Sequence, residues 1–128
     1  MCLNMKLSRI DCPNQKHGWK VIKRIDGTNK YITPLFDYDV KFNTWINDKQ
    51  SGRIYTDTFS YLHGFHIFLS REDARLYKRI NEKVVKVKFD DIVAYGYQYT
   101  TIVDGSTQYV RRLKVVVAKK IFFTTVRG

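Results

Sequence analysis

The chain has 128 residues, 44% of them hydrophobic and 27% charged, which is the balance of one soluble globular domain with its own core. Its net charge is +11, its pI is about 9.7 and 15% of its residues are aromatic. Such a charge favours polyanionic partners, namely nucleic acid, nucleotides or an acidic protein patch, unless it serves solubility alone. No apolar run approaches the roughly 18 residues of a membrane-spanning helix, so we expect no membrane partner.

The first third of the chain predicts an irregular arm followed by strands. Residues 1–17 are mixed and largely polar, and they predict the arm. Polar and apolar residues alternate over 19–25, and Asp26-Gly27 then favours a hairpin that returns as a strand over 30–33. A period of two over 36–42 predicts a further strand before a polar loop.

The stretch Gly64–Tyr77 predicts a buried strand that runs directly into a capped helix. Apolar residues on both faces of 65–69 are typical of an interior strand that is covered on both sides. Ser70 suits the N-cap, because its hydroxyl can accept a hydrogen bond from a free N–H of the first turn. An apolar stripe predicts a helix over about 71–81 that lies against a sheet. The stripe consists of Ala74, Tyr77 and Ile80.

The second half of the chain predicts further strands. Strict alternation over 84–89 predicts a strand that ends at Asp90-Asp91. Residues 92–103 predict another strand, in which Gly96 marks either a bulge or a close approach of the backbone. Asp104-Gly105 is a second hairpin signal, and one or two more strands follow it.

Together these elements predict an α+β fold in a single domain over residues 1–128. We expect a strongly bent antiparallel β-sheet of about six to eight strands, half-barrel-like in shape. One main helix at about 71–81 would pack against this sheet.

The cysteines and the absence of known catalytic motifs limit the kinds of chemistry that we expect of the chain. Cys2 and Cys12 are interpreted as free thiols in a reducing compartment, with a disulfide as the alternative, and a cytoplasmic location is therefore predicted. Two Cys and three His offer little material for a zinc site, so no metal and no cofactor are expected. The chain has no P-loop, GxGxxG, HExxH or GxSxG motif, and a protein that is not an enzyme is predicted.

A small enzyme acting on nucleic acid or nucleotides is the alternative. Its best candidates for general acid–base catalysis are His66 with Tyr77 or Asp91. The position of His66 between apolar residues favours a core histidine instead. Asp90 and Asp91 are adjacent, and they would point to opposite faces of a strand, which argues against a metal-binding pair.

A basic segment near the end of the chain is the candidate binding surface. From Ser106 onward there are six basic residues and no acid, interleaved with aromatic residues, as in surfaces that bind single-stranded nucleic acid. The alternative is a solvated outer face of an antiparallel sheet. Alternation predicts that Arg111 and Arg112 lie on opposite faces of their strand. The candidate binding residues are Arg111, Arg112, Lys114, Lys119, Lys120, Arg75, Lys78, Arg79, Tyr97, Tyr99 and Tyr109.

Several short motifs carry a resemblance to a known group of proteins. They are Met1-Cys2-Leu3, Trp19-Lys20-Val21-Ile22, Tyr31-Ile32-Thr33-Pro34, Gly64-Phe65-His66-Ile67-Phe68, Glu72-Asp73-Ala74 and Val85-Lys86-Val87. In this order they resemble small accessory proteins encoded by bacteriophages and prophages. The resemblance implies a viral gene product that acts in the cytoplasm of an infected bacterium.

The resemblance and the basic charge together predict an anti-CRISPR-like function. The chain would bind and inhibit a host defence nucleoprotein complex, through contacts with RNA, DNA or an acidic protein patch. The alternatives are the nuclease-like enzyme above and a plain single-stranded nucleic-acid-binding protein. The sequence leaves the oligomeric state open.

Overall fold

The computed structural model describes residues 3–34 and 38–124, and strands dominate this part of the chain. The strands are β1 (Met5–Leu7), β2 (His17–Arg24), β3 (Tyr31–Ile32), β4 (Trp45–Asn47), β5 (Arg53–Tyr55), β6 (Ser60–Leu62), β7 (Phe65–Phe68), β8 (Glu82–Asp104) and β9 (Thr107–Phe123). The helices are the 3₁₀ turn η1 (Arg9–Asp11) and α1 (Arg71–Tyr77).

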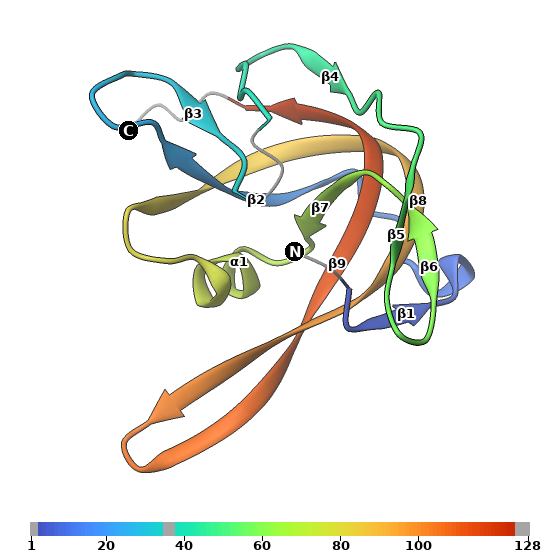
Figure 1. Cartoon of the computed structure of the whole chain (residues 1–128), viewed down its shortest axis with the longest axis vertical. Helices are drawn as coiled ribbons and strands as arrows, with labels where there is room; N and C mark the ends of the chain where they lie inside the picture. Colours follow the sequence, from blue (N-terminus) through green and yellow to red (C-terminus); the bar gives the residue numbers. More distant parts are fainter. Residues whose placement is uncertain (1–2, 35–37, 125–128) are drawn as a thin grey trace.

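Two long strands, β8 and β9, form the spine of the molecule (Figure 1). They pair antiparallel from Val87 opposite Phe123 to Asp104 opposite Thr107. β1 and β2 pair with β8, β4 and β7 pair with β9, and β3 is added to β2, giving a seven-stranded sheet. β5 and β6 form a separate two-stranded sheet. The far end of the β8–β9 hairpin projects well beyond the body (Figure 1).

The predicted α+β class with one main helix is wrong, because the described chain is mostly β-sheet. The helix α1 has seven residues and ends at Tyr77 rather than near residue 81. Lys78 already has an extended backbone, and Asn81 takes a positive φ of 69° in the turn that leads into β8. Ile80, the last residue of the predicted stripe, is 88% exposed. The helix therefore ends before a third turn, and the last residue of the apolar stripe lies beyond it.

The sheet also does not close as a barrel. Its strands are arranged along the β8–β9 spine rather than in the half-barrel that the sequence predicted. β2 and β7 meet through a single residue pair, Trp19 opposite Phe68. In contrast, β2 and β8 share a continuous ladder from His17 opposite Lys88 to Lys23 opposite Glu82.

The local signals around β7 are confirmed. All four residues of β7 are buried, because its two faces contribute to two core clusters. Phe65 and Ile67 join Val85, Val87, Phe89 and Ile121 in one cluster. Phe68 joins Leu3, Tyr61, Leu113 and Val115 in the other. Ser70 caps α1, since its hydroxyl accepts a hydrogen bond of 3.2 Å from the Asp73 N–H.

Both predicted hairpins are present, and each has a glycine with a positive φ. Gly27 has a φ of 75° between β2 and β3, and Gly105 has a φ of 60° between β8 and β9. Gly96 marks a close approach of the backbone rather than a bulge, because a Cβ at this position would lie 1.9 Å from the Met5 carbonyl oxygen. Any side chain here would displace β1 from the spine.

Three predicted segment boundaries differ from the structure. β8 continues through Asp90-Asp91 instead of ending there, with a bulge between Ile92 and Ala94 and a φ of 60° at Asp91. The predicted strand over 36–42 lies partly outside the described residues, and its described part makes only isolated bridges. The predicted irregular arm contains β1, η1 and the buried Leu3, while its residues 1–2 lie outside the described part.

Lys20 is buried inside the core although it carries an amine. Its Nζ donates a hydrogen bond of 2.8 Å to the His66 carbonyl oxygen. Burial lowers the pKa of Lys20 to about 8, because a charged amine is poorly solvated in the protein interior. The folded state therefore carries a free-energy cost for the charged form of Lys20.

We predict that Lys20→Met raises the free energy of unfolding at pH 7 by up to about 3 kcal/mol. The pKa of Lys20 falls from 10.5 to about 8 on folding, so the unfolded chain binds more protons between these two pH values. The burial cost is thus full below pH 8 and fades as the pH rises toward 10.5. Urea unfolding across this range measures the gain. A gain that does not change with pH, or that exposed Lys86→Met reproduces, would contradict the prediction.

Candidate nucleic-acid interface

Four strands bring two aromatic and two basic side chains into one line across the sheet. Lys88 of β8 lies opposite His17 of β2 on one side and opposite Phe122 of β9 on the other. Phe122 in turn lies opposite Trp45 of β4. Residues directly opposite one another in a sheet share a face, so the four side chains form a continuous row. We call His17, Lys88, Phe122 and Trp45 the aromatic–lysine row.

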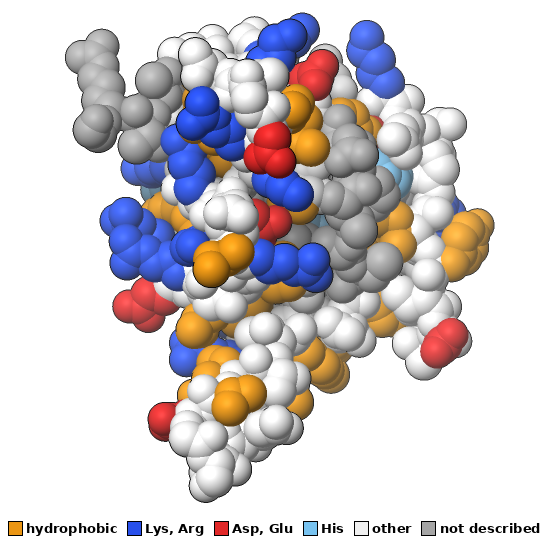
Figure 2. Space-filling model, turned by 60° about the vertical axis from the view of Figure 1, so that its left-hand side comes forward, with side chains coloured by type: hydrophobic (Ala, Val, Ile, Leu, Met, Phe, Trp, Pro, Cys, Tyr) orange, Lys and Arg blue, Asp and Glu red, His pale blue; other side chains and the backbone are white. Residues whose placement is uncertain are grey.

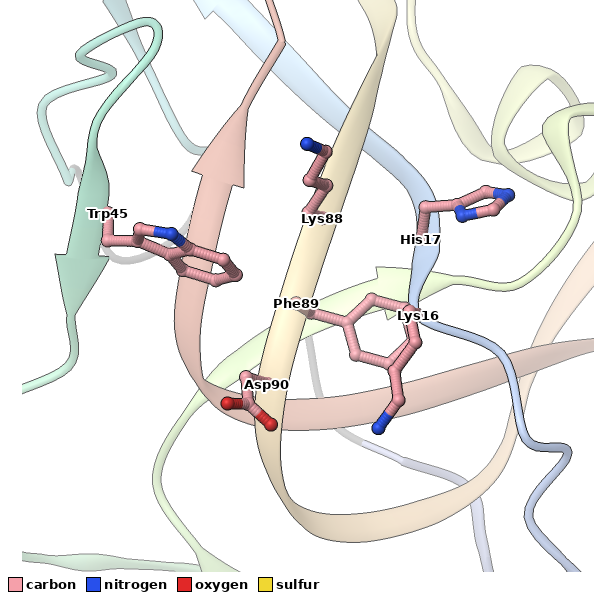
Figure 3. Close-up of a pocket in the computed structure, with 6 residues that line it drawn as sticks. All are labelled: Lys16, His17, Trp45, Lys88, Phe89 and Asp90. Atoms are coloured by element: carbon pink, nitrogen blue, oxygen red, sulfur yellow. The ribbon is translucent and has the colours of Figure 1, made fainter.

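Within this row, Trp45 contacts Phe122, and Phe122 contacts Lys88. The Trp45 and Phe122 rings have centroids 5.6 Å apart, and Lys88 Nζ lies 5.3 Å from the centroid of the Phe122 ring. Trp45 remains 48% exposed, so one face of a large ring is available to a ligand. Figure 3 shows the Trp45 side chain reaching from β4 across β9 toward β8.

An open pocket of about 320 Å³ adjoins the row. Trp45, Lys88 and His17 line it, and Lys16 adds a second lysine from the segment before β2 (Figure 3). Two residues from Phe122 along β9, exposed Lys120 lies opposite both Asp90 of β8 and Asn47 of β4. Asp90 is the only acidic residue among those that line the pocket in the described chain.

This arrangement suits a planar ring joined to an anionic group. An exposed tryptophan can stack on a base, and lysines within reach can contact the neighbouring phosphates. The pocket is open rather than enclosed, which suits one unit of a longer polymer better than a small molecule buried on all sides.

The candidate residues at the end of the chain are divided between two faces. Tyr97 lies opposite Lys114 and Tyr99 opposite Arg112 on one face of the β8–β9 hairpin. The Arg112 guanidinium lies 5.7 Å from the centroid of the Tyr97 ring. Arg111 lies on the other face, as the alternation predicts, with its guanidinium 3.7 Å from the Asp73 carboxylate of α1.

The other candidate residues do not join this cluster. Tyr109 is exposed nearer the tip of the hairpin, on the face of Arg111. Arg75, Lys78 and Arg79 are exposed on α1 and on the turn after it. Lys119 is partly buried, and its Nζ donates a hydrogen bond of 2.8 Å to the Gln50 carbonyl oxygen. The structure therefore brings together Tyr97, Tyr99, Arg112 and Lys114, and it places Lys120 beside the aromatic–lysine row.

Sequence reasoning missed most of the aromatic–lysine row. The strand predicted over 36–42 ends before Trp45, and the alternation over 84–89 places Lys88 only on the polar side of its strand. The available signal was this polar side, Lys86 and Lys88, facing away from the buried valines. Nothing in the local sequence, however, places Lys88 beside Trp45.

A buried polar cluster around Asp48 was also not predicted. The Tyr38 hydroxyl and the Gln50 N–H donate to Asp48 Oδ1, and His63 Nδ1 lies 2.5 Å from Oδ2. Burial alone would raise the pKa of Asp48, but these hydrogen bonds outweigh it and lower the pKa. Lys119 Nζ lies 3.9 Å from Oδ2. The cluster thus ties the loop after β4 to β9 and to the segment before β7.

His66, on which the enzyme alternative depends, lies in the core. It is 2% exposed, and its Nε2 lies 3.0 Å from the Tyr61 hydroxyl. Burial holds the pKa of His66 well below its ordinary value, so the ring stays neutral. Asp91, in contrast, is exposed at the bulge of β8. The two residues therefore do not meet in an open site, which removes the best candidate for acid–base catalysis.

Comparisons with protein-family models, with curated proteins and with solved structures gave no match. Within residues 3–34 and 38–124, no helix is long and apolar enough to cross a membrane. In the same ranges, no group of three or more His, Cys, Asp or Glu side chains is placed to hold a metal ion. Function is therefore inferred from the geometry of the surfaces described above.

We predict that Arg112 contributes more to nucleic-acid binding than Arg111. Arg112 stacks on Tyr97 beside Lys114, whereas Arg111 is already held near Asp73. If Arg112 contacts a phosphate of a single strand, Arg112→Ala should flatten the log–log dependence of affinity on salt by about 0.7. Fluorescence anisotropy with a single-stranded oligonucleotide over a salt series measures this slope. Equal effects of Arg111→Ala and Arg112→Ala would indicate only a diffuse basic surface.

Proposed function

We propose that this chain is a non-enzymatic binding protein for single-stranded nucleic acid, with the aromatic–lysine row as its binding platform. One observation carries the proposal: Trp45, Phe122, Lys88 and His17 lie in register on four adjacent strands. A row across a sheet matches a single strand that is laid over it, since successive bases can meet aromatic faces while the backbone follows the cations.

Charge supports the same proposal. The net charge is +11, and Lys16, Lys86 and Lys120 are exposed near the row, with Asp90 as the neighbouring acid. Nucleic-acid affinity rises with the number of phosphates that such cations neutralise. Lysine and arginine side chains form several separate patches on the body of the protein in Figure 2.

The direct test is Trp45→Ala, which removes the stacking surface but leaves the charge unchanged. Loss of one stacked base weakens binding by roughly 5- to 150-fold. Lys88→Ala should weaken binding and flatten the salt slope by about 0.7. Anisotropy with a labelled single-stranded oligonucleotide, and with a duplex of the same sequence, measures both effects.

Lys30→Ala is the matched control, because it removes the same charge from the exposed β2–β3 turn. It should lower the affinity much less than Lys88→Ala. Binding by Trp45→Ala that equals the wild type, or a preference of the wild type for the duplex, would overturn the proposal. Circular dichroism of each variant confirms that the sheet is intact.

The biological role that we propose is inhibition of a host defence nucleoprotein complex, in the cytoplasm of a phage-infected bacterium. The resemblance to phage accessory proteins supports this role, and the platform would contact the nucleic acid of such a complex. A pull-down from infected host lysate should recover a defence ribonucleoprotein with the wild type and less of it with Trp45→Ala. Recovery of no defence component, together with no plating advantage on defended hosts, would contradict the role and leave the binding test above unaffected.

A further inference from the structure

We propose that the projecting end of the β8–β9 hairpin pairs edge to edge with the same segment of a second copy, giving a two-fold symmetric dimer. We call residues 98–110 the arm. In Figure 1 the arm extends away from all other elements. A two-stranded hairpin with no further support is only marginally stable in water, so a partner strand would stabilise it.

The composition of the arm fits a protein partner rather than nucleic acid. Among its thirteen residues, Asp104 is the only charged one, although 27% of the whole chain is charged. Apolar side chains are instead exposed on it: Val103 is 64% exposed and Val110 is 62% exposed. In Figure 2 the projecting end shows mainly white and orange surface, while the blue surface lies on the body and at the base.

The edge formed by β9 is the longer open edge of the arm. Beyond the arm, β7 pairs with residues 115–118 of β9, and the backbone of Lys114 is bonded to Leu69 and to the Asp73 carboxylate. Residues 107–112 pair with β8 alone in the described chain. The backbone N–H and C=O groups of successive residues alternate in direction along a strand. The backbone groups of Gln108, Val110 and Arg112 therefore point away from β8, as those of Lys114 do.

The edge formed by β8 is shorter. The Tyr97 carbonyl accepts from the Asn4 N–H, and the Tyr99 N–H donates to the Asn4 side chain. These bonds show that the backbone N–H and C=O groups of the odd-numbered residues of β8 point away from β9. Between Tyr99 and the turn, only Thr101 and Val103 therefore offer unpaired backbone groups on this edge. Native proteins usually protect open edges with charge, proline or bulges. The β9 edge carries its charge only at the base, in Arg111 and Arg112.

Several two-fold registers are compatible with the outward backbone groups, and the one centred on Val110 forms the most backbone hydrogen bonds. With Val110 on the two-fold axis, Val110 lies opposite Val110 of the second copy, Gln108 opposite Arg112, and Tyr109 opposite Arg111. About six backbone hydrogen bonds form, and every cross-strand pair is apolar or complementary. Placing Arg112 on the axis would set like charges opposite one another. Placing Gln108 there would leave fewer residues to overlap.

The length of the arm also reduces the repulsion between two bodies of +11 each. The open segment sits at the far end of the molecule (Figure 1), so the bodies stay apart when the arms meet. Because salt screens the remaining repulsion, added salt should maintain or strengthen the dimer. Nucleic-acid binding responds to salt in the opposite direction, so the two associations are distinguishable.

Sedimentation velocity of the full chain without nucleic acid tests the proposal, over roughly a hundredfold range of concentration that brackets the micromolar affinity of a small interface. Val110→Pro removes an outward N–H of β9 and no bond to β8, and it should weaken the dimer by more than about tenfold. Val103→Pro is the matched control, because it removes an outward N–H on the β8 edge. It should leave the dimer unchanged.

A second pair of variants keeps every N–H group. Val110→Lys places two like charges on the axis and should also weaken the dimer. Val110→Cys should be joined to its own copy by a short bis-maleimide reagent, in a chain where Cys2 and Cys12 are replaced by Ser, whereas Val103→Cys should not. A monomer at every concentration, a dimer that survives both Val110→Pro and Val110→Lys, or equal loss with Val103→Pro would overturn the proposal.

Discussion

The antiparallel ladder between β8 and β9 is the constraint on which the rest of the structure depends. Each of these strands is longer than all the strands that attach to it, and each offers its outer edge to others. β1 and β2 use the edge of β8, while β4 and β7 use the edge of β9. A change in the β8–β9 register would therefore shift every one of these pairings together. A shift by one residue would also turn side chains to the opposite face of the sheet.

The two surfaces of interest lie at opposite ends of this ladder. Near one end, four strands are side by side, and the aromatic–lysine row exists only because all four are present. At the other end the ladder has no neighbours, and the arm exposes an edge. Between them, the bulge after Asp91 and the close contact at Gly96 bend the spine and fix β1 on it. The same pair of strands thus provides a supported platform and an unsupported hairpin.

Features that depend on neighbouring residues could be predicted from the sequence. The hairpins at Gly27 and Gly105 and the cap at Ser70 follow from local signals, and the structure has all three. The length of the helix could not be predicted, because Ile80 continues the apolar spacing of α1 although the backbone has already turned. The fold class was wrong for the same reason.

The candidate site could not be predicted from the sequence, because its residues are far apart along the chain. Trp45 and Lys88 are neighbours through Phe122, and their relation depends on two registers between strands that are far apart in sequence. Alternation gives the face of each side chain within its own strand, but it does not give the register. The division of Arg111 and Arg112 between faces could be predicted, because both lie on one strand. The Asp48 cluster, built from four separated segments, could not.

The position of the spine in the chain has a consequence for the order of folding. β1 pairs with residues 95–97, and β2 pairs with residues 82–88, so the first strands have no spine to join until the second half of the chain has been made. The β8–β9 hairpin, in contrast, joins residues close in sequence at its turn and can close early. During synthesis β1 and most of β2 must therefore wait for their partner strand β8, although β2 can already pair with β3 at its end. The long separation between paired residues makes this a slowly assembling protein, with an interval of exposure to aggregation while it is being made.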